Sequence, residues 1–476
     1  MKKNIWMMTA IMGIVLAGVV QADVFTWTAT SSGNWDDGGN WTLVSGSSGR
    51  TYPNNSADTA DITNNISSDV VITIPAAGIT VGVTKVGDAD ASHMLSFAGS
   101  GSITFSGGAD PFNVINGATV QLDVPTAFGS NARILNGAGL LIINQPISNS
   151  SFLRFQPTGL TVRMNAEFQG IASGKLQFYG CPLQVGMTGS LLSNTEFLDM
   201  YGAGPMSAYG QDRTIDDRVR LSHSAYGEVL VDGMNTLEIT GEAILVGRAG
   251  RDFGMIIDTA TLHLSGDVTW TLTNDKLTDL GDRPDGPELV NNATLLISGS
   301  GNTYTDSTGA GVNIEGTGTF MVNNQTGSVT GTGNTNWIAS GVTLAGNGSI
   351  AGSTLILRGG TIAPGTNAVG TLAVGPATFE TGSTYAWENS KDEVDLLTVS
   401  GNLTIADNFT IAITELNQGI GASDIITYTG AFSGTPSAWT INGPAGYESV
   451  TVEDTGSAIR LTGLPAAPTG TVIIIK

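Results

Sequence analysis

The sequence Thr236-Leu237-Glu238-Ile239-Thr240-Gly241 recurs as Thr261-Leu262-His263-Leu264-Ser265-Gly266 and as Thr294-Leu295-Leu296-Ile297-Ser298-Gly299. In each copy apolar residues largely alternate with other residues, and the copy ends in glycine, which permits the positive φ of a tight corner. Weaker copies lie at 119–122, 343–346, 354–357, 371–374 and 403–405. The pattern predicts many short strands.

A single strand of this kind cannot bury its apolar face. If each turn of chain, roughly 20 to 30 residues long, stacks on the one before it, the inward Leu, Ile and Val form a continuous core. The repeat therefore predicts an all-β protein built as a β-solenoid. A β-sandwich, or a series of sandwich modules, is the alternative that would give the same alternation.

The composition agrees with this fold class. Gly supplies 65 of 476 residues, hydrophobic residues are 41% and charged residues only 13%. Collagen needs glycine at every third position, and disorder needs more charge, so both are excluded. The formal net charge of -22 argues against nucleic acid as a partner, because phosphate binding needs clustered Lys and Arg.

Residues 1–22 have the features of a secretory signal peptide. Lys2 and Lys3 precede an apolar run from Ile5 to Val20, and Val20-Gln21-Ala22 offers small residues for cleavage. We therefore expect an exported protein, extracellular or on the outer cell surface, whose mature chain starts near Asp23. A membrane anchor is the alternative for this run, and no second apolar run could anchor the mature chain as a helix.

The rest of the chain divides into four predicted regions. We expect an N-terminal cap at 23–75, solenoid repeats at 76–375, a C-terminal β-strand cap at 376–463 and a short tail at 464–476, which is either a last strand or a docking segment. The N-terminal region contains Trp27, Trp35 and Trp41. We expect these aromatic rings to cap the first coil, and the alternative is a platform on which sugars stack.

Several segments resemble exported bacterial proteins with autotransporter-associated β-strand repeats. The likeness rests on Gly33-Asn34-Trp35 with Asn40-Trp41, on 53–62, on Gly360-Thr361-Ile362-Ala363-Pro364-Gly365 with 370–374, and on 395–401. The resemblance implies a right-handed parallel β-helix, secreted or at the cell surface. The chain lacks the translocating β-barrel with which autotransporters end, so the likeness is to passenger repeats alone.

The densest charged stretch runs from Gln211 to Arg220. Alternation along one strand would place Asp212, Thr214, Asp216, Arg218 and Arg220 on one face, which makes Asp212, Asp216, Arg218 and Arg220 the candidate catalytic residues for a polysaccharide lyase or glycoside hydrolase. The alternative, which we favour, is a charged outer face with ion pairs between coils.

Metal and cofactor sites have little support in the sequence. Asp279, Asp282 and Asp285 are candidate calcium ligands in an acidic loop, as are Asp88 and Asp90, but their spacing does not match a calcium-binding loop. A solvated loop is the preferred interpretation, and calcium is left open. Cys181, the one cysteine, is expected to be a buried apolar residue, and His263 is expected to point outward from its strand. No nucleotide cofactor is expected.

The sequence thus favours a secreted or cell-surface structural or adhesion protein without catalytic activity. Its expected partners are extracellular polysaccharide or other cell-surface components. The alternative is a polysaccharide-active enzyme or carbohydrate binder on the same scaffold.

Overall fold

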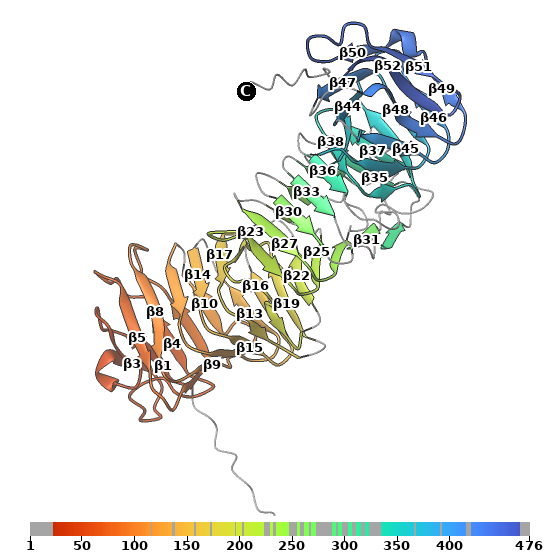
Figure 1. The fold of residues 1–476 in the computed structure, drawn as a ribbon. Coiled ribbons are helices and arrows are strands. Elements are labelled where there is room, and N and C mark those ends of the chain that lie inside the picture. Colours follow the sequence, from red (N-terminus) through yellow and green to blue (C-terminus); the bar gives the residue numbers. More distant parts are fainter. Residues whose placement is uncertain are drawn as a thin grey trace, which may run out of the picture.

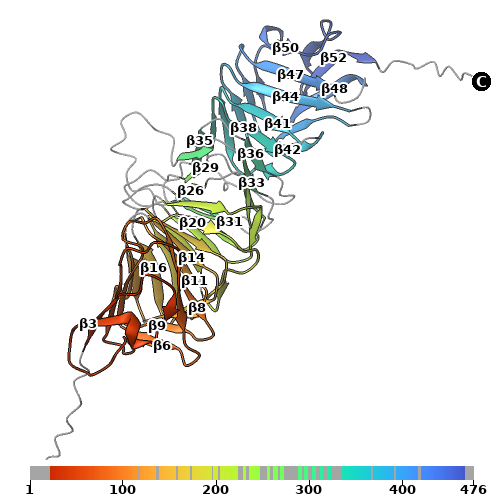
Figure 2. The ribbon, with the colours of Figure 1, turned by 90° about the vertical axis from the view of Figure 1, so that its left-hand side faces the viewer.

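The computed structural model describes residues 22–466 apart from short internal gaps, of which 247–254, 273–287 and 323–334 are the longest. Residues 1–21 of the expected signal segment and residues 467–476 of the expected tail lie outside the described residues. The described chain is an elongated stack of strands, with one end of the sequence at each end of the stack (Figures 1 and 2). Two 3-10 turns, η1 (Gly38–Asn40) and η2 (Pro436–Ala438), accompany the strands.

Three sheets build the N-terminal half. Sheet A contains β3 (Trp41–Ser45), β1 (Val24–Trp27), β4 (Thr59–Ile62), β7 (Val83–Val86), β10 (Phe112–Val114), β13 (Ala132–Leu135), β16 (Phe152–Gln156), β19 (Lys175–Tyr179), β22 (Phe197–Tyr201), β25 (Val219–Ser222), β28 (Ala243–Val246), β31 (Val268–Leu272) and β34 (Thr303–Asp306). Sheet C contains β6 (Ile79–Val81), β9 (Ile103–Phe105), β12 (Thr126–Phe128), β15 (Ile147–Asn149), β18 (Phe168–Gln169) and β21 (Leu192–Ser193).

Sheet B extends along the whole stack as an unbroken series of parallel pairings. It contains β2 (Gly33–Asn34), β5 (Val70–Ile74), β8 (Met94–Gly99), β11 (Thr119–Leu122), β14 (Gly139–Ile143), β17 (Leu160–Met164), β20 (Leu183–Val185), β23 (Pro205–Ala208), β26 (Val229–Val231), β29 (Met255–Ile257), β32 (Glu288–Asn291), β35 (Gly311–Glu315), β37 (Thr335–Ala339), β40 (Thr354–Arg358), β43 (Ala377–Phe379), β46 (Leu403–Ile405) and β49 (Phe432–Ser433).

Two further sheets replace C and then A toward the C-terminus. Sheet D contains β24 (Arg213–Ile215), β27 (Thr236–Ile239), β30 (Thr261–Leu264), β33 (Thr294–Ile297), β36 (Thr319–Val322), β38 (Thr343–Gly346), β41 (Thr361–Pro364), β44 (Thr384–Asn389), β47 (Thr410–Glu415) and β50 (Thr440–Asn442). The C-terminal sheet contains β39 (Ser349–Ile350), β42 (Thr371–Val374), β45 (Leu396–Val399), β48 (Ile420–Tyr428), β52 (Ala458–Ala466) and β51 (Thr451–Asp454).

The chain visits the sheets in rotation, so each coil adds one strand to each of three sheets. From β4 the order is A, B, C up to β21, then A, B, D, and from β37 onward B, D, C-terminal sheet. Each strand pairs in parallel with the strand one coil later, whereas a sandwich is built from antiparallel strands. The prediction of a parallel β-solenoid is confirmed.

The core is a column of inward side chains from successive coils. Alternation is clear in β27 and β30, where Leu237 and Leu264 are fully buried, and His263 between two buried leucines is only half-buried, as expected. In-register aromatic rings stack from coil to coil; the ring centroids of Phe155 and Phe178 are 4.9 Å apart. Such ladders align one coil with the next.

The parallel coils extend past both predicted boundaries of the repeat region. β4 and β5, which precede residue 76, already pair in parallel with β7 and β8 of the next coil. Sheets B and D continue after residue 375 as far as β49 and β50. Between the strands that the structure describes, antiparallel ladders occur at the two ends: β3 pairs with β1, and β52 joins β48 and β51. The longer strands expected near the C-terminus are present in β48 and β52.

Candidate functional site

A ladder of threonines runs along the outward face of sheet D. Registered pairing places Thr at one position in nine consecutive strands, at 236, 261, 294, 319, 343, 361, 384, 410 and 440. The repeat motif arises from this position, because the residue that follows Thr is buried in β27, β30, β36, β38, β41, β44 and β47. Rungs of a sheet repeat at about 4.8 Å, so the ladder offers hydroxyl and methyl groups at that interval.

The neighbouring outward position changes character along the ladder. It is Glu238 and His263 in the first coils, whose side chains pair with each other (His263 Nδ1 to Glu238 Oε1, 3.4 Å). It is Ala363, Ala386 and Ala412 in later coils. At this position the face is therefore smooth and uncharged from β41 to β47.

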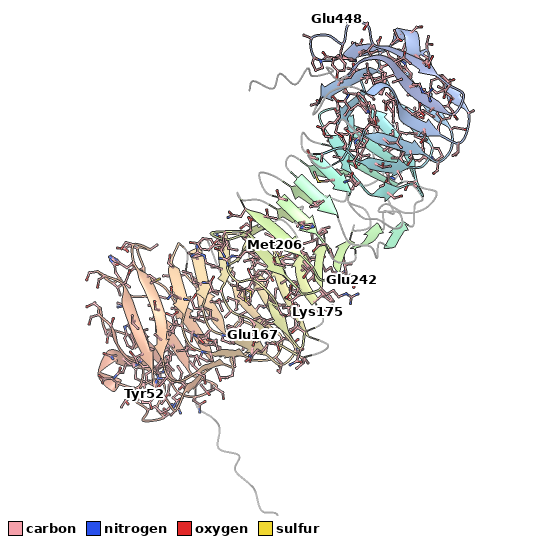
Figure 3. The ribbon with its side chains drawn as sticks, viewed as in Figure 1. Tyr52, Glu167, Lys175, Met206, Glu242 and Glu448 are labelled. Carbon is pink, nitrogen blue, oxygen red and sulfur yellow. The ribbon has the colours of Figure 1, made fainter. Side chains whose placement is uncertain are left out.

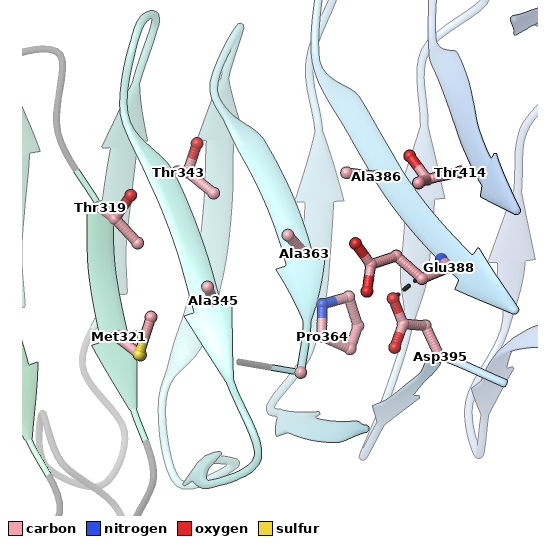
Figure 4. Close-up of a pocket in the computed structure, with 11 residues that line it drawn as sticks. Thr319, Met321, Thr343, Ala345, Ala363, Pro364, Ala386, Glu388, Asp395 and Thr414 are labelled. Atoms are coloured by element: carbon pink, nitrogen blue, oxygen red, sulfur yellow. Dashed lines mark hydrogen bonds between the residues drawn. The ribbon is translucent and has the colours of Figure 1, made fainter. Parts of the chain in front are cut away.

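A shallow groove of about 240 Å³ lies on this smooth part of sheet D (Figure 4). It is lined by Thr319, Met321, Thr343, Ala345, Ala363, Pro364, Gly365, Ala386, Glu388, Asp395 and Thr414. Among these lining residues, only Glu388 and Asp395 have ionisable side chains. The groove thus combines hydroxyls and small apolar groups along its length with two carboxyl groups near its C-terminal end.

Backbone hydrogen bonds fix Asp395 beside Glu388. The Gly370 N–H donates to Asp395 Oδ1 at 2.8 Å, and the Glu388 N–H donates to Asp395 Oδ2 at 2.9 Å, the bond drawn dashed in Figure 4. Burial raises the pKa of the Asp395 carboxyl to about 7, with a further contribution from the nearby Glu388 charge, while the two backbone N–H groups oppose the rise.

Buried aromatic side chains support this corner from inside. Trp387 Nε1 donates to the Asp395 carbonyl oxygen at 3.0 Å, and the Tyr385 hydroxyl donates to the Ile425 carbonyl oxygen at 2.9 Å. Both rings are fully buried. Asp395 itself is fully buried and both of its carboxyl oxygens accept backbone hydrogen bonds. This arrangement suits a structural clamp between coils better than an acid or base that must meet substrate.

The structure separates the four candidate catalytic residues. The expectation of one strand from Asp212 to Arg220 is wrong: β24 belongs to sheet D, β25 belongs to sheet A, and the chain turns a corner at 216–218. Asp212 Oδ1 accepts from Thr236 N at 2.7 Å, and Asp216 Oδ1 accepts from the Thr240 hydroxyl at 2.8 Å. Both partners belong to the next coil.

The two arginines also act separately. Arg218 pairs with Glu242 of the next coil (Nε to Oε2, 2.6 Å), and the Arg220 guanidinium carbon lies 5.7 Å from the Phe197 ring centroid. Contacts of this kind between neighbouring coils are the arrangement favoured from the sequence. The four residues do not converge on a common site.

The three N-terminal tryptophans are core residues. Trp27 and Trp35 are fully buried and Trp41 is 6% exposed. Trp41 meets the other two rings edge-on, at centroid distances of 5.0 and 4.8 Å. Rings packed against one another in this way offer no face to a sugar, so the stacking-platform alternative is wrong.

One group of potential metal ligands lies in the described part of the chain. Asp88, Asp90 and His93 can bring one ligand atom each within 4.8 Å of one another. Asp88, however, is buried and accepts hydrogen bonds from the backbone N–H groups of Ile66, Ser92 and His93. The carboxylate therefore closes a turn. The other calcium candidates, Asp279, Asp282 and Asp285, lie outside the described residues.

Cys181 is buried, as expected, and burial raises the pKa of its thiol far above the ordinary value. Within the described residues, no helix has the length and apolar character needed to cross a membrane. No protein-family model matches the chain, and no curated protein matches it in sequence.

Proposed function

We propose that this protein is a secreted or cell-surface β-solenoid that binds polysaccharide without cleaving it and so serves adhesion or matrix assembly. The observation that carries the proposal is the groove along sheet D, where threonines stack on threonines and small apolar side chains stack beside them, in register from coil to coil. The coil interval of about 4.8 Å is close to the length of one sugar ring in an extended chain.

Charge favours a neutral polysaccharide. The chain has a net charge of -22, and the two charged groups lining the groove are both carboxyls. An anionic polymer would be repelled by this field, whereas hydroxyl groups of a neutral sugar chain can both donate to and accept from threonine. The resemblance to passenger-type repeats supports the same location, outside the cell.

A glycan-cleaving enzyme is the second candidate, and one observation favours it: Glu388 and Asp395 lie together in the groove, and the pKa of Asp395 is raised to about 7. Most glycosidases use a pair of carboxyl groups, one of which has a raised pKa. The burial of Asp395 and its two backbone hydrogen bonds weigh against this assignment.

Binding to a glycan array, followed by a reducing-sugar assay with calcium and with chelator, tests both candidates. The double variant Thr319→Val, Thr343→Val keeps the shape of the groove and removes two of its hydroxyls. We expect it to bind at least tenfold more weakly, from about 1 kcal/mol per lost hydrogen bond. The matched control is Thr80→Val, Thr104→Val, an in-register outward pair on sheet C.

Absence of glycan binding, or equal loss in both double variants, would overturn the proposed function. Release of new reducing or unsaturated ends that disappears in Glu388→Gln would replace it with the enzyme.

A further inference from the structure

Two buried carboxylates lie side by side at the N-terminal end of the solenoid. Asp23 and Asp58 are both fully buried. The Arg50 guanidinium bridges them, with Nη2 at 3.1 Å from Asp23 Oδ2 and 2.5 Å from Asp58 Oδ1. Arg50 comes from the same loop as Tyr52, which Figure 3 labels at this end of the molecule.

Hydrogen-bond donors surround both carboxylates. The Ser48 hydroxyl donates to Asp23 and lowers the pKa of its carboxyl, and the Ser47 N–H also donates to Asp23, at 3.1 Å. The Asn54 N–H donates to Asp58 Oδ2 at 3.1 Å. Donors of this kind stabilise the negative form of the carboxylate.

The charges in this cluster do not balance. Among the described residues, Arg50 is the one cationic side chain in contact with the two carboxylates, so the buried group carries a net charge of about one negative unit. Burial of an uncompensated charge is costly, so a second cation in contact with these carboxylates would stabilise the cluster.

The backbone nitrogen of Asp23 lies where that cation is needed. It donates to Asp58 Oδ1 at 3.2 Å. Ala22, the residue before it, is exposed, so the chain enters the protein at the peptide bond between Ala22 and Asp23. Val20-Gln21-Ala22 is also the stretch whose small residues fit a signal-peptide cleavage site.

We propose that cleavage of the Ala22–Asp23 bond creates an N-terminal ammonium group that completes this buried ion cluster, so that export processing stabilises the first coil. In this hydrolysis water adds across the amide bond: Ala22 leaves with the new carboxylate, and the Asp23 nitrogen becomes an amine that binds a further proton at neutral pH. The ammonium then pairs with Asp58 and brings the cluster to neutrality. The idea rests on the export assumed in the proposed function.

Three forms of the otherwise complete mature chain test it: one starting at Asp23, one starting at Ala22, and one starting at N-acetylated Asp23. The first has the ammonium in the cluster, the second moves it one residue outward, and the third keeps an N–H donor without charge. Hydrogen exchange of β1 and β4 reports the local opening of this coil. At pH 6.5 we expect about tenfold or greater protection in the Asp23 form than in the other two, the effect of a charged hydrogen bond.

The effect has a defined pH dependence. The charged groups around this nitrogen in the described structure are Asp23, Asp58 and Arg50. An α-amino group has an ordinary pKa of about 7.7 to 8.0, and its carboxylate neighbours raise the folded value. The extra protection should be complete below about pH 7.7 and disappear as the pH rises through the folded pKa. The acetylated form should lack this loss.

Two results would overturn the inference: equal protection of β1 in all three forms at pH 6.5, or a difference that is unchanged at pH 10. In Asp58→Asn the advantage of the Asp23 form should shrink severalfold. If this variant does not fold, the pH profile of the unsubstituted forms decides. N-terminal sequencing of exported protein adds an independent check, with Asp23 expected first. None of these readouts involves glycan, so failure of the proposed binding function would leave them interpretable.

Discussion

Raising the pH from 5 to 8 should loosen the coil around Asp395. The folded pKa is about 7 and the ordinary value is 3.8, so between these values the folded state holds a proton that the opened state has released. Stability therefore falls as the pH rises from about 4 to 7 and then levels off. Between pH 5 and 7 two pH units correspond to about 2.7 kcal/mol.

The actual free-energy difference should be smaller, because the groove beside Asp395 is open to water. Halving the value of about 2.7 kcal/mol for solvent screening leaves about 1.4 kcal/mol, which is about tenfold in local opening. Hydrogen exchange of β44 and β45, corrected for the intrinsic pH dependence of exchange, measures this quantity directly.

Variants assign the effect to one carboxyl. Asp395→Asn cannot titrate and should flatten the pH dependence, while Glu388→Gln removes a repelling charge and should reduce it. Asp424→Asn is the matched control, since Asp424 pairs with Arg460 (2.6 Å) in the C-terminal sheet and should leave the pH dependence of β44 unchanged. Protection that rises with pH, or a pH dependence that survives in Asp395→Asn, would refute the assignment.

Three further predictions concern the core. Leu355→Ala, at a fully buried position of β40, should lower the free energy of unfolding by about 2–5 kcal/mol. Ile356→Ala, on the half-buried side of the same strand, should lower it by about 1 kcal/mol or less. Urea unfolding followed by hydrogen exchange in β40 compares the two variants, and equal losses of stability would contradict the assignment of inward and outward residues. Trp35→Ala removes a buried ring whose Nε1 donates to the Pro53 carbonyl oxygen at 2.8 Å. It should destabilise the first coil by about 3–5 kcal/mol without changing glycan affinity. Weaker glycan binding by the folded variant would support the interpretation of the tryptophans as a sugar-stacking platform. The Cys181 thiol should not react with a thiol reagent in the folded protein and should react after unfolding in urea, because burial raises its pKa and removes access; rapid labelling of folded protein would place it at the surface.

The threonine motif predicts the fold because its alternation indicates which residues of each strand face inward. Thr236, Thr261 and Thr294 identify one register position of sheet D, and the structure extends that position to Thr440. The same motif at 119–122 and 354–357 belongs to sheet B. Alternation describes any strand with one buried side, so it cannot tell which of the three faces of a coil a strand occupies.

The candidate site was harder to predict, since corners decide which side chains meet. The segment from Asp212 to Arg220 contains no glycine or proline, and alternation alone therefore placed its charges on one strand. Conversely, Glu388 and Asp395 are brought together by the bridge between Asn389 and Val394, which requires knowledge of the fold. The Ala22–Asp23 junction is intermediate. The sequence predicts the cleavage site, but it does not predict that the Asp23 nitrogen lies beside Asp58.

The threonine ladder stays in register although the coils differ in length. Two successive threonines are separated by 18 residues between 343 and 361 and by 33 residues between 261 and 294. The differences in length therefore fall between the strands, and the entropy of closing a loop grows by only about 0.6 kcal/mol for each doubling of its length. The threonine ladder therefore keeps a fixed spacing while the connections between strands vary in length. Foreign peptides could be grafted into these connections at regular intervals without changing the ladder.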